Sequence, residues 1–394
     1  MKLNLFFTFA AVIAVAQAAT STQKVLNTND SKAKNGLNVK TIIHNHDKPN
    51  VLEAHVKKFG GETLAYVTPW NNRGYDVVKE FKGKFDYVSP VWYYIQRRSP
   101  MQFDFDGEHD VDQGWMKEVK DIKTNMGKIL PRFQFRGWTS EDLRVFVGSS
   151  EESAALANEI NQQVQKYGFD GVVVECGYPA FFQKFLSDLS SLLHSEKKQL
   201  IVVLPSVITE EHKQFMKPEI FDAMAKYIDR FSIMTYDYSS HDPNGGPNSP
   251  IEWIMDNIDY LTNEENRHQL LIGLNMYAMS YLHTRAPEPL VMKTVVEKLT
   301  YQPREYDELL EPEEQETGDD QELNWDKETQ EAWFIDIDED GIRQGTVWMP
   351  TYRSIRNRVR LAEDYGVGIA LWEVGQGLDY YCIIHCCISH YIAA

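Results

Sequence analysis

The feature that most constrains the fold is a regular alternation of short apolar runs with helix-like segments. Eight apolar runs lie at 63–70, 85–94, 128–138, 169–177, 199–206, 229–238, 269–277 and 366–375. Helical patterns separate them, as at 152–167, 180–194 and 251–261. Near-continuous apolar strands alternating with helices indicate a parallel sheet that helices cover. Eight such units that close on themselves predict an α/β fold, the (β/α)8 TIM barrel.

One connection is too long to be a single helix. The segment between 277 and 366 contains the acidic stretch "REYDELLEPEEQETGDDQELNWD" and the strand-like stretch "EAWFIDIDEDGIRQGTVWM". Asp340-Gly341 is typical of a hairpin turn. We therefore predict a small α+β lobe, at about 281–350, inserted between strands 7 and 8. "DIDEDG" resembles a calcium loop without its last glutamate ligand, so we predict a turn and no metal.

The two ends of the chain differ from the predicted barrel at 61–380. Lys2, the apolar run 3–15 and the small residues Ala16 and Ala18 predict a signal peptide at 1–18 and a secreted or luminal protein. We interpret 19–60 as a polar, flexible leader with a helix at about 50–59 and a glycosylation candidate at Asn29. The tail 381–394, with "CIIHCCISHYIAA", is atypical, and either a genuine extension or a missed splice site accounts for it.

Composition excludes several functions. A formal net charge of -18 argues against nucleic acid and anionic membrane surfaces as partners. No later apolar stretch is long enough to span a bilayer, so we predict no membrane insertion. Cys176 lies in an apolar run and the other three cysteines crowd the tail, which does not suggest a disulfide framework. No glycine-rich phosphate loop or metal-ligand spacing is present, so we predict no cofactor.

Aromatic residues gather where the predicted strands end. Because TIM barrels carry their sites at the C-terminal ends of the strands, these residues are candidates for one shared cleft. They are Trp70, Trp92, Trp138, Tyr178, Tyr236, Tyr277 and Trp372. Aromatic faces pack against the apolar surfaces of sugar rings. The pattern favours a saccharide cleft over simple core packing.

Three segments carry a family resemblance. "FDGVVVECGYP" at 169–179 resembles the signature of the family 18 glycoside hydrolases, which reads F-D-G-x-D-x-D-x-E-Y-P. "IMTYDY" at 233–238 and "GIALWEVG" at 368–375 resemble the sixth and eighth strands of that family. The similarity covers roughly 62–379. "WNNRGYDVVKEFKGKFDYVSPVW", "PRFQFRGW" and "WEVGQGLDYY" are similar to its chitinase domain-containing branch.

The resemblance implies roles for particular residues. Tyr236 and Asp237 match the pair that holds the N-acetyl group of the sugar, Met234 lies beside them, and Trp372 matches the tryptophan at the floor of the site. It also implies chitin-like or amino-sugar oligosaccharides as ligands, lysosomal or secretory-granule traffic, and a sorting or scavenger receptor as partner. The predicted saccharide-binding set is Trp70, Trp92, Glu175, Tyr178, Met234, Tyr236, Asp237, Tyr277 and Trp372.

The chain departs from the family where catalysis occurs. The three acids of D-x-D-x-E become Val173, Glu175 and Gly177, and Gly177 occupies the position of the proton donor. Strand alternation puts all three positions on one face. Glu175 lies two residues below the donor position, about 6.6 Å at about 3.3 Å per residue. A general acid must come within about 3 Å of the atom that it protonates.

We therefore expect no catalytic residue, and a saccharide-binding homologue without hydrolase activity. Two alternatives stay open: a weak family 18 glycoside hydrolase that uses Glu175, and a protein-interaction scaffold with a vestigial pocket. Glu175 itself either contacts sugar directly or is a buried carboxylate paired with Tyr236 or an arginine.

Overall fold

The computed structural model describes residues 37–48, 54–121, 124–301, 323–338 and 340–381. Its main sheet has the order β4-β3-β6-β7-β8-β9-β10-β16-β1-β2-β5. The strands are β1 (Thr63–Val67), β2 (Tyr87–Pro90), β3 (Tyr93–Ser99), β4 (Gln102–Asp106), β5 (Lys128–Ile129), β6 (Arg132–Phe135), β7 (Gly171–Glu175), β8 (Gln199–Pro205), β9 (Arg230–Met234), β10 (Leu270–Asn275) and β16 (Gly368–Trp372). All eight predicted runs contain strand.

The sheet closes on itself through two interrupted strands. β2 continues into β3 after Val91 and Trp92, and β5 continues into β6 after Leu130 and Pro131. β2 pairs parallel with β5 and β3 pairs parallel with β6, so both ends of the sheet belong to the same two barrel strands. β1 lies between β16 and β2 in parallel register. The predicted (β/α)8 barrel is confirmed.

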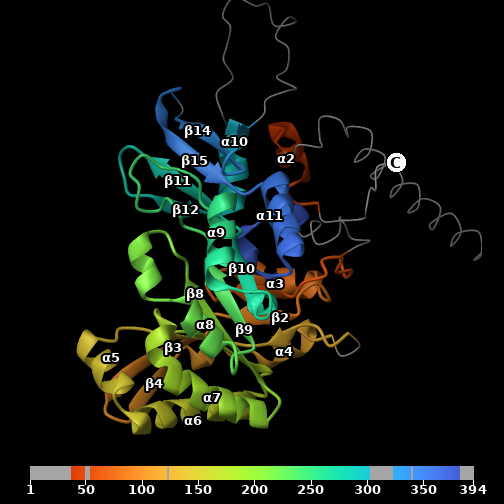
Figure 1. The fold of residues 1–394 in the computed structure, drawn as a ribbon. Coiled ribbons are helices and arrows are strands. Elements are labelled where there is room, and N and C mark those ends of the chain that lie inside the picture. Colours follow the sequence, from red (N-terminus) through yellow and green to blue (C-terminus); the bar gives the residue numbers. More distant parts are fainter. Residues whose placement is uncertain (1–36, 49–53, 122–123, 302–322, 339, 382–394) are drawn as a thin grey trace, which may run out of the picture.

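Helices surround the barrel (Figure 1). They are α3 (Asn72–Glu80), α4 (Gln113–Val119), α5 (Ser140–Val147), α6 (Ser150–Tyr167), α7 (Gln183–Ser195), α8 (Pro218–Met224), α9 (Ile251–Leu261) and α11 (Tyr352–Tyr365). Local signals set their ends. The Ser149 hydroxyl accepts from the Glu152 N–H at the start of α6, and Gly168, at φ 69°, ends that helix.

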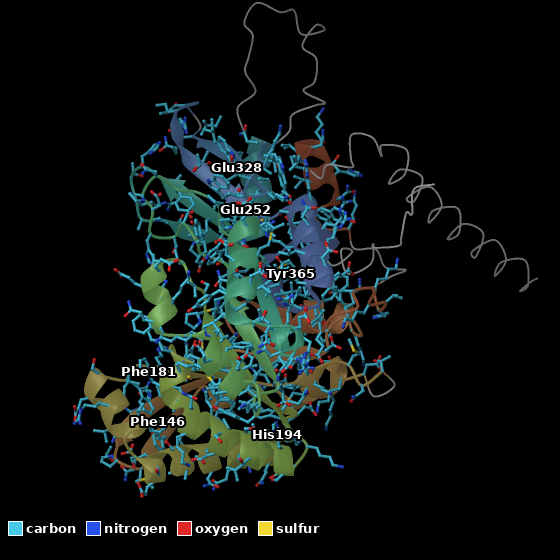
Figure 2. The ribbon with its side chains drawn as sticks, in the orientation of Figure 1. Phe146, Phe181, His194, Glu252, Glu328 and Tyr365 are labelled. Atoms are coloured by element: carbon cyan, nitrogen blue, oxygen red, sulfur yellow. The ribbon has the colours of Figure 1, made fainter. Side chains whose placement is uncertain are left out.

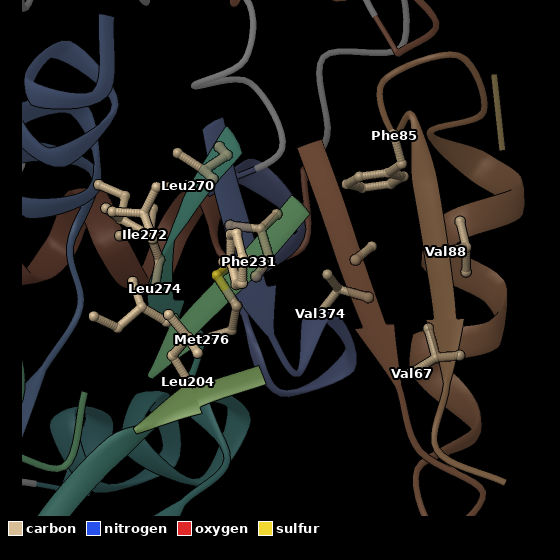
Figure 3. Packing of buried hydrophobic residues seen from close by; sticks show 14 of the residues in the cluster. Val67, Phe85, Val88, Leu204, Phe231, Leu270, Ile272, Leu274, Met276 and Val374 are labelled. Atoms are coloured by element: carbon tan, nitrogen blue, oxygen red, sulfur yellow. The ribbon is translucent and has the colours of Figure 1, made fainter. Parts of the chain in front are cut away.

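Alternation along each strand separates two apolar layers. Outward side chains, among them Val67, Val88, Phe231 and Leu274, pack in the large core cluster (Figure 3). Inward side chains form a second cluster inside the barrel, made of Leu64, Tyr66, Tyr87, Val91, Leu130, Val173, Ile201, Val203, Leu271 and Ala370. Met234 and Trp372 pack against this inner cluster from the C-terminal ends of their strands. The barrel is thus filled, and only its mouth is left for a ligand.

An aromatic part of the large core cluster includes residues of α5 and α7. Phe146, at the end of α5, is fully buried and contacts the rings of Phe135, Trp138 and Phe185 (Figure 2). The Trp138 Nε1 donates to the carbonyl oxygen of Ile95 at 2.8 Å. Trp138, an aromatic at a predicted strand end, therefore belongs to this cluster.

An α+β lobe follows β10 (Figure 1). It contains β11 (Ala278–Leu282), β12 (Glu288–Leu290), α10 (Met292–Tyr301), β13 (Asn324–Asp326), β14 (Glu331–Ile337) and β15 (Arg343–Met349), with sheet order β12-β11-β15-β14-β13. β14 and β15 form an antiparallel hairpin. In its turn Asp338 Oδ1 accepts from the N–H groups of Asp340 and Ile342. The turn predicted at Asp340-Gly341 thus lies between β14 and β15.

Part of the predicted leader is folded. α2 (Val39–Asn45) buries Val39 and Ile42, and Leu37 joins the core. Residues 54–59 are not helical, so the helix expected at about 50–59 is wrong over its described part. The signal peptide, Asn29 and the tail from Cys382 lie outside the described residues. Within the described ranges, no helix combines the length and apolar character needed to cross a bilayer.

Candidate functional site

The candidate site lies at the mouth of the barrel, where β7 ends at Glu175. The neighbouring strand β6 pairs Gln134 with Glu175 and Arg132 with Val173. This register places two polar side chains beside the carboxylate. Arg132 Nη1 donates to Glu175 Oε2 at 2.7 Å, and Gln134 Nε2 donates to Oε1 at 2.6 Å. Of the alternatives above, Glu175 is the carboxylate paired with an arginine, and its side chain keeps 18% exposure.

Trp372 lies beside this pair. The guanidinium carbon of Arg132 is 5.1 Å from the centroid of the Trp372 ring, within reach of a cation–π contact. The rings of Tyr66 and Tyr236 lie 5.1 and 6.4 Å from the same tryptophan. The Tyr66 hydroxyl donates to Ser232 Oγ at 2.9 Å across the barrel. Trp372 thus has a fixed position but keeps a partly exposed surface.

The strand-six pair follows β9. Asp237 has φ 64°, a left-handed backbone that is uncommon for a residue other than glycine. Its N–H donates to Asn248 Oδ1 at 2.6 Å, and the Tyr277 hydroxyl donates to its carboxylate. Burial raises the pKa of Asp237 above its ordinary value, and the bond from Tyr277 offsets part of that effect. Such strain is common at functional sites.

The Tyr236 phenol lies within electrostatic range of both Glu175 and Asp237. Burial raises its pKa well above the ordinary value, and the charges of Tyr66, Glu175 and Asp237 add to that effect. Its ring also makes an edge contact with Tyr277 at 6.5 Å. Glu175 and Asp237 are therefore close enough to the same phenol to influence it. The structure brings Glu175, Met234, Tyr236, Asp237, Tyr277 and Trp372 into one region, and their binding of a saccharide stays a prediction.

Gly177, in the family's donor position, lies beyond the end of the strand. It is exposed, has φ 72°, and a Cβ added there meets no atom within 4 Å. The strand ends at Glu175, so the rise per residue of a strand does not extend to Gly177. Open space therefore surrounds the position that the first atom of a side chain at residue 177 would take.

The other three predicted residues differ in exposure. Trp70 is 63% exposed in the turn after β1. Tyr178 is 43% exposed, and its ring lies 4.6 Å from that of Phe215. Trp92 is fully buried, and its Nε1 donates to the Tyr75 hydroxyl at 2.7 Å. Trp92 is thus a core residue in this structure and presents no surface to a ligand.

Sequence reasoning missed Arg132, Gln134 and Tyr66. The signal for the first two is present in "PRFQF", where polar Arg132 and Gln134 alternate with Phe133 and Phe135. Strand alternation puts both polar side chains on the inward face. The pairing of β6 with β7 joins residues that are far apart in the sequence. The local pattern therefore does not show that Arg132 and Gln134 contact Glu175.

Glu373 is a further acid beside Trp372, but it faces the opposite way. It is 1% exposed and lies against the β1–α3 turn, where Thr68 and Asn71 interact with it. Burial raises its pKa to about 7, and the nearby Thr68 and Asn71 side chains offset part of the effect. Glu373 therefore bears on the packing around the mouth and does not line it.

Comparison with known proteins shows the family to which this chain belongs. The family model described as "Glycosyl hydrolases family 18" matches residues 62–377. The cortical fragment-lytic enzyme of Bacillus subtilis is 21% identical over 264 residues, covering 64% of this chain and 57% of that protein. The enzyme of the same name from Bacillus cereus is 23% identical over 297 residues, covering 69% and 64%. The chain thus spans less than two thirds of the length of these curated relatives.

Solved structures show the same fold. The spore cortex-lytic enzyme SleL of Bacillus cereus aligns with a TM-score of 0.64 at 17% identity, covering 82% of this chain and 73% of that one. A chitinase from Chromobacterium violaceum aligns with a TM-score of 0.65 at 18% identity, covering 83% and 98%.

These relatives correct one prediction. The cortical fragment-lytic proteins, the SleL structure and the chitinase are all named as enzymes. The prediction that this chain is an inactive family member is therefore wrong. That prediction assumed that Glu175 and Gly177 lie on one continuous strand, so that Glu175 is two residues too far from the leaving oxygen. The strand ends at Glu175, and this spacing therefore does not apply to Gly177.

Proposed function

Because the chain belongs to glycosyl hydrolase family 18, we propose that it is a glycoside hydrolase that acts on glycans with N-acetylated amino sugars and uses Glu175. The observation that carries this proposal is the position of Glu175. Its carboxylate stands at the open mouth of the barrel, near Trp372 and Tyr236, with free space at Gly177.

Glu175 supplies the negative charge that the reaction needs. Its two oxygens accept from Arg132 and Gln134, an arrangement that suits an ionised, acceptor-only carboxylate. In family 18 the acetamido group of the substrate is the nucleophile, and a neighbouring carboxylate orients it. We assign that orienting role to Glu175. It also stabilises the positive charge that develops on the sugar ring.

Asp237 is the second carboxyl group of the site. Since burial raises its pKa, it holds a proton at a higher pH than an ordinary aspartate. We assign it the transfer of that proton to the leaving glycosidic oxygen. The acetamido oxygen of the substrate bonds to the anomeric carbon as the bond between that carbon and the leaving oxygen breaks, which gives an oxazolinium ion. Water then attacks the anomeric carbon, the bond to the acetamido oxygen breaks, and the proton that water loses returns to Asp237. Asp237 takes the place of a donor at position 177, so we expect a rate below that of an enzyme with an acid at that position, by no more than the roughly 10²–10⁴-fold that a general acid contributes.

The test is release of fluorophore from chitobioside and chitotrioside substrates at pH 4 to 8. The wild type should turn over slowly, faster at acidic pH, and Glu175→Gln should abolish the signal. That variant leaves the buried Arg132 cation unpaired, so circular dichroism must first show that it is folded. Full activity in folded Glu175→Gln, or no turnover by the wild type, contradicts the proposal.

We also propose the finer assignments that follow from sequence. The segments 70–92, 131–138 and 372–381 support a place in the branch of chitinase domain-containing protein 1 (stabilin-1-interacting chitinase-like protein). The relatives reported above are bacterial cortex-lytic enzymes and chitinases, so this placement rests on those segments alone. Residues 1–18 support entry into the secretory pathway and delivery outside the cell. The resemblance to that branch is the basis on which we propose a lysosome or secretory granule as destination and a receptor as partner. N-terminal sequencing of the secreted protein should find Ala19 first, and retention of Met1 contradicts the proposal.

A further inference from the structure

Arg132 is a buried cation in the middle of the candidate site. It is 6% exposed, and its ion-pair partner among the described residues is Glu175. Its Nε has no hydrogen-bond partner in the described part of the chain. Burying a charged group is unfavourable unless the surroundings compensate it, so such a residue invites a functional explanation.

The contacts of Arg132 form a closed arrangement. Nη1 donates to Glu175 Oε2, and Nη2 donates to Gln134 Oε1 at 3.2 Å. Gln134 in turn donates to the other Glu175 oxygen. Each oxygen of Glu175 therefore has its own donor, which fixes both the position and the plane of the carboxylate.

The same guanidinium reaches Trp372, which extends from another strand. Arg132 lies on β6 and Trp372 on β16, and β16 pairs with β10 and β1 rather than with β6. One side chain therefore contacts both the carboxylate and the tryptophan. A change at Arg132 releases both at once.

Resting on the function proposed above, we infer that Arg132 is a positioning residue that sets the Glu175 carboxylate against the Trp372 ring. It acts through those two groups and does not touch the reacting atoms. The planar guanidinium is needed for both contacts, since it donates through two separate nitrogens and lies over an aromatic face. Lysine keeps the charge but provides neither the fork nor the flat surface.

The test compares Arg132→Lys with a matched control, Arg97→Lys. Arg97 is an equally buried arginine on β3, paired with Glu152 and Asp142 outside the site. Both variants should lose stability. We expect Arg132→Lys alone to lower kcat on the chitotrioside substrate, by about 10²-fold, because misplacement by about 1 Å can have that effect. Equal kcat values in the two variants overturn the inference.

A second variant covers the case in which Arg132→Lys does not fold. Gln134→Leu leaves the ion pair in place but removes the donor to Glu175 Oε1 and the acceptor of Arg132 Nη2. It should lower kcat by about tenfold and leave KM within about twofold, as expected for loss of transition-state orientation. An unchanged kcat overturns the inference.

Chemical rescue separates positioning from a structural role. In folded Arg132→Ala, added guanidinium at millimolar concentration should restore part of kcat by filling the vacated space, whereas ammonium should not. Absence of rescue in a folded variant counts against the inference. Turnover by the wild type separates the proposed function from the inference about Arg132. If the wild type has no turnover, the proposed function fails. If the wild type turns over and an Arg132 variant has the same kcat, only the positioning role is refuted.

Discussion

Glu373 predicts how the stability of the molecule depends on pH. It is buried, and no cation pairs with it among the described residues. Burial raises its pKa from 4.5 to about 7. The folded state therefore holds this proton more tightly than the unfolded state does. The contribution of Glu373 to stability is complete below pH 4.5 and is lost as the pH rises to about 7. At about 1.4 kcal/mol for each unit of pH, that loss is about 3 kcal/mol.

Glu373→Gln should remove this dependence, because the amide is neutral at every pH and keeps a hydrogen-bonding group. Urea unfolding of both proteins at pH 4.5, 5.5, 6.5 and 7.5 gives the difference in free energy of unfolding. Relative to the wild type, the variant should gain about 3 kcal/mol between the lowest and highest pH. Glu264→Gln, at an exposed turn, is the matched control and should give a flat difference. A flat difference for Glu373→Gln refutes the reasoning.

Four further outcomes test the fold and the site. Trp372→Ala should weaken binding of chitotriose by about 2 kcal/mol, or roughly thirtyfold, in calorimetry, and unchanged binding excludes this aromatic as an anchor. Phe146→Ala should lower the free energy of unfolding by about 3–5 kcal/mol, since the ring is fully buried among aromatics; a loss below about 1 kcal/mol argues against that packing. Gly177→Ala should cost about 1–2 kcal/mol by strain alone, because φ is 72° and no atom is crowded; equal or greater stability contradicts the left-handed turn. Arg358→Met should cost about 3–5 kcal/mol in the same unfolding assay, because it leaves buried Glu331 without its cation, and a loss below about 1 kcal/mol contradicts that pairing.

The fold was predictable because its strands are buried on both faces. Parallel barrel strands have nearly continuous apolar sequences. "GVVVE" and "QLIVVLP" can therefore be predicted as strands from their own residues alone. The interruption at Pro131 was not predictable. It divides the third barrel strand into β5 and β6, and only the pairing with β2 and β3 shows that the two pieces form one strand.

The site was predictable only in part, because an aromatic residue at a strand end can be either a buried core residue or an exposed residue of the site. Trp92 and Trp372 both follow apolar runs, yet Trp92 is fully buried against Tyr75 and Trp372 keeps exposed surface. Trp92 packs in the large outer cluster and Trp372 packs against the cluster inside the barrel, so the two rings lie on opposite faces of the sheet, and the local pattern does not show which face each takes. The partners of Glu175 were hidden for the same reason, since they come from a neighbouring strand more than 40 positions earlier in the sequence.

The distance between Glu175 and a bound sugar depends on the floor of the site more than on the strand that carries Glu175. The gap of about 6.6 Å assumes a substrate held at the height of a donor side chain at position 177. Gly177 has no side chain, and a Cβ added there would meet no atom within 4 Å, so nothing at position 177 holds a substrate at that height. The floor of the proposed site is the Trp372 ring, which has Tyr66 and Arg132 among its neighbours. Because Arg132 also holds Glu175, the floor and the carboxylate are fixed relative to each other. Whether Glu175 reaches the sugar is thus decided by contacts between β1, β6 and β16, and none of them lies in the strand-four signature.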